Sequence, residues 1–390
     1  MNYTIAVPQN EAVQFEVNSL YEALLQLTDQ RCARGKRYPL AAILTLSVLA
    51  KLGGQDTPEG MAEWVKHRAK LLRTAVGITH PRLPHAVTYR RVWRQALDVR
   101  QLEGVVGQFF ARSGRPMKAL ALDGKSLRGT IPTGHSRGVY LLALYAPQTG
   151  LVLNQMEIGQ KENELTAAPA VLGGVDLVGR LVTGDALFTQ RDLSKQIVAA
   201  KGHYLWKVKD NQPTLHADIL RLFGPETVPR GSGPLQTDFR TATQVRKGHG
   251  RLETQRLTAS SLLAPTSDWP HLAQVFQLVR EVRHLASGKT SHEVLYGVTD
   301  LAAIAASPHS LLALTRQHWG IENGLHYRRD VTFHEDASRL RDQAAHVIAI
   351  LNNLTLGLCR QRGFGSIPQA RRRLDAFPDE ALGFVLHALA

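Results

Sequence analysis

The chain has 390 residues, with 47 Lys and Arg against 33 Asp and Glu, which gives a formal net charge of +14. A surface this basic favours a polyanionic ligand. The two cysteines, Cys32 and Cys359, are too few for a disulfide framework or a cysteine zinc site, which predicts a reducing compartment. Residues 1–11 lack a secretion-signal pattern, and the apolar run near residues 40–50 is too short to span a bilayer. We therefore expect an intracellular protein without membrane contact.

Residues 1–115 are predicted to form a helical domain. Apolar side chains recur at helical spacing in 17–27, 40–52 and 61–76. A Pro-rich turn at 80–84 then precedes a basic helix, capped by Thr88, that carries Arg90, Arg91 and Arg94. A helix, a turn and a basic helix form an arrangement that places the last helix on DNA. The alternative is a solvated basic face on an ordinary helical domain.

After Met117 the sequence pattern changes from helical periodicity to short apolar runs bounded by glycine. Three predicted strands are followed by a helix, a strand, a helix and a strand, at 117–123, 139–145, 151–158, 163–172, 180–183, 191–200 and 203–209. This is the element order of an RNase H-like α/β domain, with residues 116–214 as its first part. In that order Asp123 ends the first strand, Asp185 follows the fourth, and these two strands lie side by side.

Residues 215–305 are predicted to form an inserted, mainly β subdomain. The segments 238–259, 271–284 and 291–300 alternate polar and apolar residues between turns. We expect four basic side chains here to face DNA: Arg246, Lys247, Arg251 and Arg256. Helical character returns at residue 308, and residues 306–390 complete the core. The predicted fold class is α/β: an RNase H-like catalytic domain with an inserted mainly-β subdomain and a helical N-terminal domain.

The segment from His318 to Asp330 sets one carboxylate, Glu322, among basic and hydrogen-bonding side chains. Read at helical period, Trp319, Asn323 and His326 share its face. A carboxylate among cations, with no Cys or close His pair to form a zinc site, suits Mg²⁺ and a phosphate-bearing substrate.

Asp123 and Asp185 are the natural partners of Glu322. Three carboxylates brought together repel one another unless divalent metal neutralises them. Two Mg²⁺ ions about 4 Å apart can activate the attacking oxygen and stabilise the leaving oxygen of a phosphodiester. Glu335 and Asp336 are an alternative source of the third carboxylate, although they also suit the cap of a helix that begins near Ala337.

Other side chains are candidates for DNA contact. Basic side chains near the ends of the catalytic strands can hold the scissile phosphate, amides can bind the backbone, and Trp319 can stack on an unpaired terminal base. Their ordinary alternatives are solvated lysines and a core tryptophan. The complete set of candidates is Lys125, Arg128, Lys207, Lys209, Asn211, Gln212, Arg316, His318, Trp319, Asn323, His326, Arg329, Arg90, Arg91 and Arg94.

Motifs spread over essentially the whole chain resemble those of the H-repeat-associated (ISAs-type) family of bacterial insertion-sequence transposases, a branch of the DDE transposases. The matching segments are Arg37–Leu40, Leu122–Gly129, Lys161–Glu164, Thr183–Ala186, Lys207–Gln212, Gly248–Glu253 and Glu322–Asp336. Related transposases carry a Tyr, Arg, Glu, Lys signature around the glutamate. Here Thr315, His318 and Arg329 stand in the places of the Tyr, Arg and Lys. His318, Trp319 and Arg316 are then the candidates for the phosphate and base contacts.

The resemblance implies a DNA transposase that cuts the ends of its element and joins the freed 3′ ends to target DNA. It implies that Asp123, Asp185 and Glu322 form the catalytic, metal-binding triad, with Mg²⁺ as cofactor and Mn²⁺ as a substitute. The implied partners are double-stranded DNA, as terminal repeats and target, and a second copy of the chain, because two element ends must be held together. The implied location is cytoplasmic and nucleoid-associated. The alternatives are a metal-dependent nuclease without strand transfer and a non-catalytic DNA-binding protein derived from a transposase.

Overall fold

The computed structural model describes residues 2–5, 13–112, 114, 117–159, 161–224 and 238–389. The chain divides into two compact units: unit 1 comprises residues 1–116, 124–167 and 322–390, and unit 2 comprises residues 117–123 and 168–321. Three predictions fall partly outside the described residues: the boundary at 115–116, the missing signal at 1–11, and the stretch 225–237 of the β-rich region.

Unit 2 is built on a mixed β-sheet. Its strands are β3 (Ala119–Ser126), β6 (Leu181–Gly184), β7 (His203–Val208), β8 (Arg240–Gly248), β9 (Arg251–Ser260), β10 (Gln274–His284) and β11 (Thr290–Thr299). They lie in the order β3-β6-β7-β11-β10-β9-β8, and the boundary between the units falls inside β3. The β3–β6 and β6–β7 pairs are parallel and the others antiparallel. The predicted neighbourhood of the first and fourth strands of the core is confirmed.

The segment after residue 212 is β-rich, as predicted, and the inserted subdomain stays a prediction. The segment opens with helix α9 (Pro213–Phe223) and continues into β8 to β11. Because β11 pairs with β7, these long strands extend the sheet that contains β3 and β6. Alternating polarity identifies a strand without identifying the strand with which it pairs, so the sequence pattern could not decide this point.

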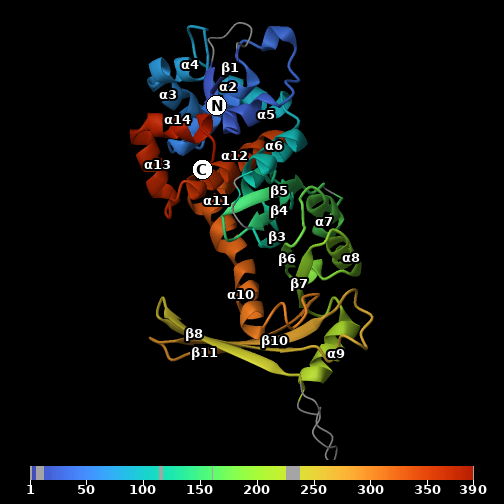
Figure 1. Cartoon of the computed structure of the whole chain (residues 1–390). Coiled ribbons are helices and arrows are strands. Elements are labelled where there is room, and N and C mark those ends of the chain that lie inside the picture. Colours follow the sequence, from blue (N-terminus) through green and yellow to red (C-terminus); the bar gives the residue numbers. More distant parts are fainter. Residues whose placement is uncertain are drawn as a thin grey trace, which may run out of the picture. The chain divides into compact units, whose positions relative to one another are not determined.

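Helices cover the sheet of unit 2. Helix α8 (Arg191–Ala199) packs on β7, and α10 (Pro308–His318) lies against β6, β8 and β9 (Figure 1). Ser307 caps α10 by accepting from the Ser310 N–H, and Pro308 occupies the first turn, where no N–H is needed. Leu257, Leu278 and Leu311 belong to the core between sheet and helix. Helix α7 (Glu164–Gly173) crosses the unit boundary.

Unit 1 combines the N-terminal and C-terminal helices with two antiparallel strand pairs, β1–β2 and β4–β5. Its elements are β1 (Asn2–Ile5), β2 (Val13–Glu16), α1 (Leu20–Leu25), α2 (Leu40–Leu52), α3 (Pro58–His67), α4 (Ala69–Ala75), α5 (Ala86–Gln95), α6 (Val99–Ala111), β4 (Tyr140–Ala146), β5 (Leu151–Glu157), α11 (Tyr327–Val331), α12 (Asp342–Gln361), α13 (Ile367–Ala376) and α14 (Pro378–Leu386). Helix α2 is buried along its whole length, and α12 packs against α2, α5, α6 and β5. The N-terminal helices therefore share a core with the C-terminal helices.

Two local predictions in the N-terminal region are corrected. Thr88 is not the N-cap of the basic helix, because α5 begins at Ala86 and His85 caps it by accepting from the Val87 N–H. The predicted helix 61–76 is two helices, since Arg68 leaves helical geometry between α3 and α4. Boundaries are the least certain part of a periodicity argument, because a capping side chain is recognised by its geometry.

Candidate active site

Asp123 lies on β3, and Asp185 directly follows the neighbouring parallel strand β6. The register pairs Ala119 with Leu181 and Ala121 with Thr183. Continued by two residues, this register sets Asp123 opposite Asp185, with both side chains on the same face of the sheet. Asp185 is exposed and Asp123 is partly exposed. The Asp185 carboxylate also accepts from the Leu187 N–H at 3.0 Å, which caps the short 3-10 helix Ala186–Phe188.

Lys207 extends this row of charged side chains. The β6–β7 register pairs Gly184 with Trp206, so its continuation sets Asp185 opposite Lys207. Burial lowers the pKa of the Lys207 ammonium, and the carboxylates of Asp185 and Asp123 act in the opposite direction. The row therefore places one cation beside two carboxylates. Lys209 lies just beyond the end of β7 and is exposed.

His318, the last residue of α10, is buried. Its Nδ1 lies 3.1 Å from the Thr183 hydroxyl, which donates to the Leu120 carbonyl. Burial, together with the nearby Lys207 charge, lowers the pKa of His318 to about 4. A neutral, buried imidazole cannot act as a cationic phosphate ligand at neutral pH, so the predicted DNA contact of His318 is not retained.

Asn211 and Gln212 hold the loop that follows Asp185. The Asn211 amide donates to the Ala186 carbonyl at 2.6 Å, and the Gln212 amide donates to the Thr189 carbonyl at 2.8 Å. The Thr189 hydroxyl in turn donates to the Lys207 carbonyl. These side chains were predicted to bind the DNA backbone, but their amide donors serve the protein backbone here. They position the Asp185 loop.

The Trp319 ring is in contact with two cations of unit 2. The Lys207 Nζ is 5.6 Å and the Arg280 guanidinium carbon is 4.9 Å from its ring centroid. Arg280 is itself held by Glu253, with Nε and Oε1 2.6 Å apart. The stacking role predicted for Trp319 stays a prediction. The sequence pattern did not indicate Arg280 or Thr183 as site residues. Their contacts with Trp319 and His318 depend on which strands pair, which the sequence does not show.

Arg316 lies one turn before Trp319 and is partly buried. Its Nη1 donates to the Gln244 side-chain oxygen at 2.9 Å.

Glu322 and the residues after it belong to unit 1. The chain forms a π-helix over Glu322–His326 and then α11. Glu322 and Asn323 are exposed, whereas His326 and Arg329 are buried. The predicted common face of Glu322 and His326 does not put both side chains in solvent, and it lies on a π-helix where a regular α-helix was predicted.

Arg329 is fully buried and packs within unit 1. Its Nε donates to Glu335 at 2.7 Å and its Nη1 donates to the Gln155 oxygen at 3.0 Å. The predicted DNA contacts of Arg329 and His326 are therefore not retained, because neither side chain has surface to offer a phosphate. Glu335 is also buried and accepts from the Asn352 amide at 2.8 Å. These contacts make Glu335 a structural carboxylate and argue against it as the third metal ligand.

Lys125 lies on the last part of β3, which belongs to unit 1, and Arg128 follows the end of that strand. The Lys125 Nζ is 2.7 Å from each Asp330 carboxylate oxygen and 3.8 Å from Asp336. Lys125 is buried and its charge is balanced, so the predicted contact with the scissile phosphate is not retained for it. The exposed Arg128 guanidinium lies 3.8 Å from Asp336, and the phosphate contact stays a prediction for it.

The three arginines of α5 differ in their surroundings. Arg90 pairs with Glu59, and Arg94 lies 3.7 Å from Asp342. Arg91 is exposed and forms no ion pair with any residue that the structure describes. Their DNA contacts stay predictions.

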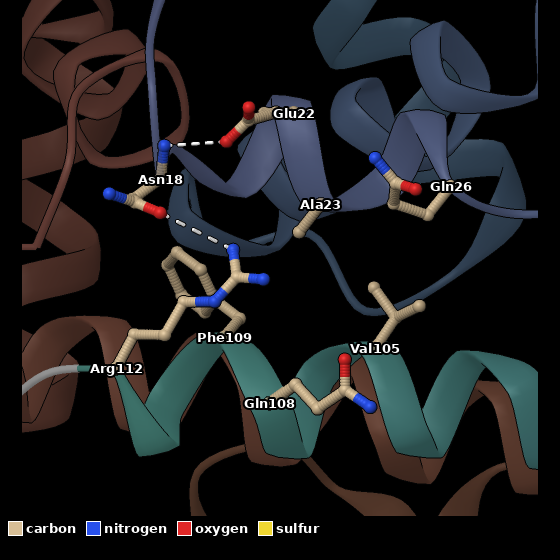
Figure 2. Close-up of a pocket in the computed structure, with 8 residues that line it drawn as sticks. All are labelled: Asn18, Glu22, Ala23, Gln26, Val105, Gln108, Phe109 and Arg112. Carbon is tan, nitrogen blue, oxygen red and sulfur yellow. Dashed lines mark hydrogen bonds between the residues drawn. The ribbon is translucent and has the colours of Figure 1, made fainter.

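A hollow of about 330 Å³ between α1 and α6 is a different kind of feature (Figure 2). Its charged lining residues are Glu22 and Arg112. Asn18 connects them, because its N–H donates to Glu22 and its side-chain oxygen accepts from Arg112 at 3.4 Å. The hollow thus contains a locally satisfied polar network and no pair of carboxylates.

No group of three or more His, Cys, Asp or Glu side chains in the described part of the chain is placed to hold a metal ion. None of its helices has the length and apolar character needed to cross a membrane.

Comparison with known proteins identifies the family. A family described as "Transposase DDE domain" matches residues 114–356, and one described as "DDE_Tnp_1-associated" matches residues 21–110. The chain belongs to the DDE-domain transposase family. The first match contains Asp123, Asp185 and Glu322, and the second contains α2 to α5. The family predicted from the motifs is therefore confirmed, and the coarse function, a DDE-type transposase, is supported.

Three relatives illustrate the family. The putative transposase YncI of Escherichia coli O157:H7 is 27% identical over 357 residues, which cover 88% of each chain. The H repeat-associated putative transposase YhhI of E. coli K12 is 24% identical over 350 residues, which cover 88% of this chain and 90% of the relative. A Xanthobacter autotrophicus protein encoded in the dhlA 3′ region is 30% identical over 68% of this chain and 88% of its own length.

Proposed function

We propose that this DDE transposase cuts DNA at the ends of its element and joins the freed 3′ ends to target DNA. The observation that carries the proposal is the parallel register of β3 and β6, whose continuation by two residues brings Asp123 opposite Asp185 just beyond the paired residues. Side chains at this edge of an α/β sheet converge on a ligand. The strand order β3-β6-β7, together with the hairpin β4–β5, supports an RNase H-like core.

The donor set fits a divalent metal. Asp123 and Asp185 offer carboxylate oxygens with solvent access, which are the ligands that Mg²⁺ and Mn²⁺ prefer. Glu322 is exposed and lies within the matched family segment, which supports it as the third ligand. When bound, the metal activates the attacking oxygen and neutralises charge on the scissile phosphate.

The chain's own residues supply orientation and charge. Asn211 and Gln212 hold the loop after Asp185, and Thr183 with His318 fixes the end of α10 against β6. Lys207 places a positive charge beside the two aspartates, where it can attract a phosphodiester. The exposed Lys209 and Arg128 are further candidates for phosphate contact, and Trp319 remains the candidate for stacking. We propose that Arg91 contacts DNA at the element ends. We also propose that the protein acts as a dimer on DNA and is located in the cytoplasm, on the nucleoid.

The test incubates the purified protein with DNA that carries the element ends, a target plasmid and Mg²⁺. Joined products that contain both DNAs are expected from the wild-type chain and are expected to be absent from Asp123→Asn, Asp185→Asn and Glu322→Gln. Each variant keeps its DNA affinity, because no positive charge is removed. Because the three carboxylates act as one unit, a double variant is no worse than a single one. Nicked DNA without joined products would indicate a nuclease that lacks strand transfer. The absence of any cleavage would indicate a non-catalytic DNA-binding protein.

A further inference from the structure

The face of the β8–β11 ribbon that carries α10 also holds an open pocket of about 420 Å³. Its polar lining comes from β8, through Gln244 and Arg246, and from one side of α10, through His309, Arg316 and Gln317. Strand β8 is at the end of the sheet order, so the pocket opens at an edge. All of these residues belong to unit 2.

Strand register divides the basic residues of the ribbon between two faces. Gln244 and Arg246 alternate with Val245 and Lys247 along β8, so Arg246 shares the pocket face and Lys247 points to the opposite one. Arg256 lies opposite Thr243, which places it on the same far face as Lys247. The sequence-based expectation treated Arg246, Lys247 and Arg256 as one DNA-facing group. The structure separates them and provides a matched comparison.

The pocket has an excess of positive charge. Glu253 lies opposite Arg246 in the register, but its carboxylate is held by Arg280 at 2.6 Å. Neither Arg246 nor Arg316 forms an ion pair with any residue in the described ranges. Arg316 donates to a neutral partner, the Gln244 oxygen at 2.9 Å, and also feels the charge of the Glu253 carboxylate, which Arg280 holds. Burial lowers the pKa of the Arg316 guanidinium and repulsion from Arg246 acts in the same direction, and together they outweigh the opposing effect of the Glu253 carboxylate.

We infer that Arg246 and Arg316 form a binding site for a DNA backbone phosphate. Two guanidinium groups present donors in the planar geometry that phosphate oxygens accept, and Gln317 and His309 add polar atoms at the rim. The contact between Gln244 and Arg316 holds one guanidinium in place before the ligand arrives, which lowers the entropy lost on binding. The site rests on the proposed function only in naming DNA as the source of the phosphate.

The charge and shape of the pocket favour a polymer over a small phosphate. The pocket is open and lies on an edge strand, where a backbone can pass. Arg251 follows at the turn between β8 and β9 on the pocket face, because it lies opposite Gly248, and the whole chain carries a charge of +14. Arg316 is also six residues before Glu322, so a phosphate held there engages the helix that leads to the proposed third carboxylate.

The experiment compares two double variants that remove equal charge from opposite faces of the ribbon. R246Q/R316Q removes the pocket cations, and K247Q/R256Q is the matched control. Binding of a fluorescein-labelled DNA duplex is followed by anisotropy over a KCl series without divalent metal. R246Q/R316Q is expected to weaken binding about tenfold. It should also reduce the slope of log K against log salt by about 1–2, while the control changes both far less.

Folding and ligand source are checked separately. Circular dichroism and thermal unfolding must show that both double variants are folded. A series of duplexes, each with one neutral methylphosphonate, should contain a position that weakens wild-type binding and leaves R246Q/R316Q unaffected. Inorganic phosphate should compete no better than chloride at equal ionic strength. Selective competition by inorganic phosphate, with no methylphosphonate effect, would overturn DNA as the source.

The result is separable from the proposed chemistry. Equal losses in the two double variants, or no loss in R246Q/R316Q, overturn the site even if the wild-type protein joins DNA. If the wild-type protein neither cuts nor joins DNA but the two double variants differ in DNA binding as expected, the phosphate site is supported and the proposed chemistry is refuted.

Discussion

The Nδ1 of His318 lies 3.1 Å from the Thr183 hydroxyl, which donates its proton to the Leu120 carbonyl at 3.1 Å. A hydroxyl has one proton to give, so it must accept from the imidazole, and Nδ1 therefore carries the hydrogen. This chain of two hydrogen bonds joins the end of α10 to β6 and β3. Thr183 precedes Asp185 by two residues, and Leu120 precedes Asp123 by three.

Replacing Thr183 by Val tests this connection. The change keeps the shape of the side chain but leaves the His318 Nδ1–H and the Leu120 carbonyl without their buried partner, and should cost about 1–3 kcal/mol in the free energy of unfolding. Urea unfolding measures the change. Thr241→Val is the control, since Thr241 is exposed and water can replace its bond to Thr258. Equal stability of the two variants would contradict the role of Thr183.

The two glutamates considered for the third metal ligand should behave in opposite ways. Glu335→Gln leaves the fully buried Arg329 without a charged partner, so we expect a stability loss of about 3–5 kcal/mol. Glu322→Gln should unfold like the wild type, because Glu322 is exposed, while losing DNA cleavage. Thermal unfolding and a cleavage assay on both variants show which of the two glutamates is the third metal ligand. A stable Glu335→Gln protein that does not cleave would reverse the assignment.

The Lys125–Asp330 pair allows a double-variant cycle. Lys125→Met, Asp330→Asn and their combination should give a coupling of about 0.5–3 kcal/mol in the free energy of unfolding, because the Lys125 side chain is buried and both Asp330 oxygens lie 2.7 Å from its ammonium. A phosphate-binding lysine would show little coupling, and Lys125→Met would then weaken DNA binding instead. The cycle and an anisotropy measurement separate the two roles.

His346 predicts a loss of stability in weakly alkaline solution. Burial alone would lower its pKa, but hydrogen bonds to Glu103 and Glu157 and the charges of these carboxylates outweigh burial and raise it to about 9. The folded state thus holds a proton that an unfolded histidine releases near pH 6.5. The stabilisation is complete below that pH and is lost as the pH rises towards 9, with a total of about 3 kcal/mol.

Urea unfolding of the wild type and His346→Gln over this pH range measures the effect. The stability difference between the two proteins should shrink as the pH rises, because the glutamine has no proton to lose. A difference that is the same at both ends of the range would show that the imidazole is neutral in the folded protein.

The elements around the two aspartates could be read from the sequence because each is set by local pattern. The predicted strands 117–123, 180–183 and 203–209 correspond to β3, β6 and β7, whose apolar runs are short and bounded by turns. The parallel register then follows from the α/β order. The catalytic role of Asp123, Asp185 and Glu322 stays a proposal, which rests on the family motif and on this register.

The environment of the basic residues could not be read in this way. Lys125, Arg329 and Arg246 look alike in a sequence, yet one is paired with Asp330, one is fully buried against Glu335 and one lines an open pocket. What distinguishes them is the partner contributed by a distant segment. Glu322 and His326 differ in the same way, since Glu322 is exposed and His326, four residues later on the π-helix, is buried.

Among the arginines of α5, Arg91 should matter most for recognising element ends. Arg90 and Arg94 each have an acidic neighbour, Glu59 and Asp342, whereas Arg91 is exposed without an ion pair in the described chain, so its guanidinium is available without breaking a contact. If it reads a base edge, Arg91→Ala should weaken binding to element ends by about 1–3 kcal/mol and leave binding to random DNA nearly unchanged. Anisotropy with terminal and scrambled duplexes measures both. Equal losses on the two duplexes would assign Arg91 to the phosphate backbone, and a larger loss from Arg94→Ala would move recognition to the end of the helix that faces α12.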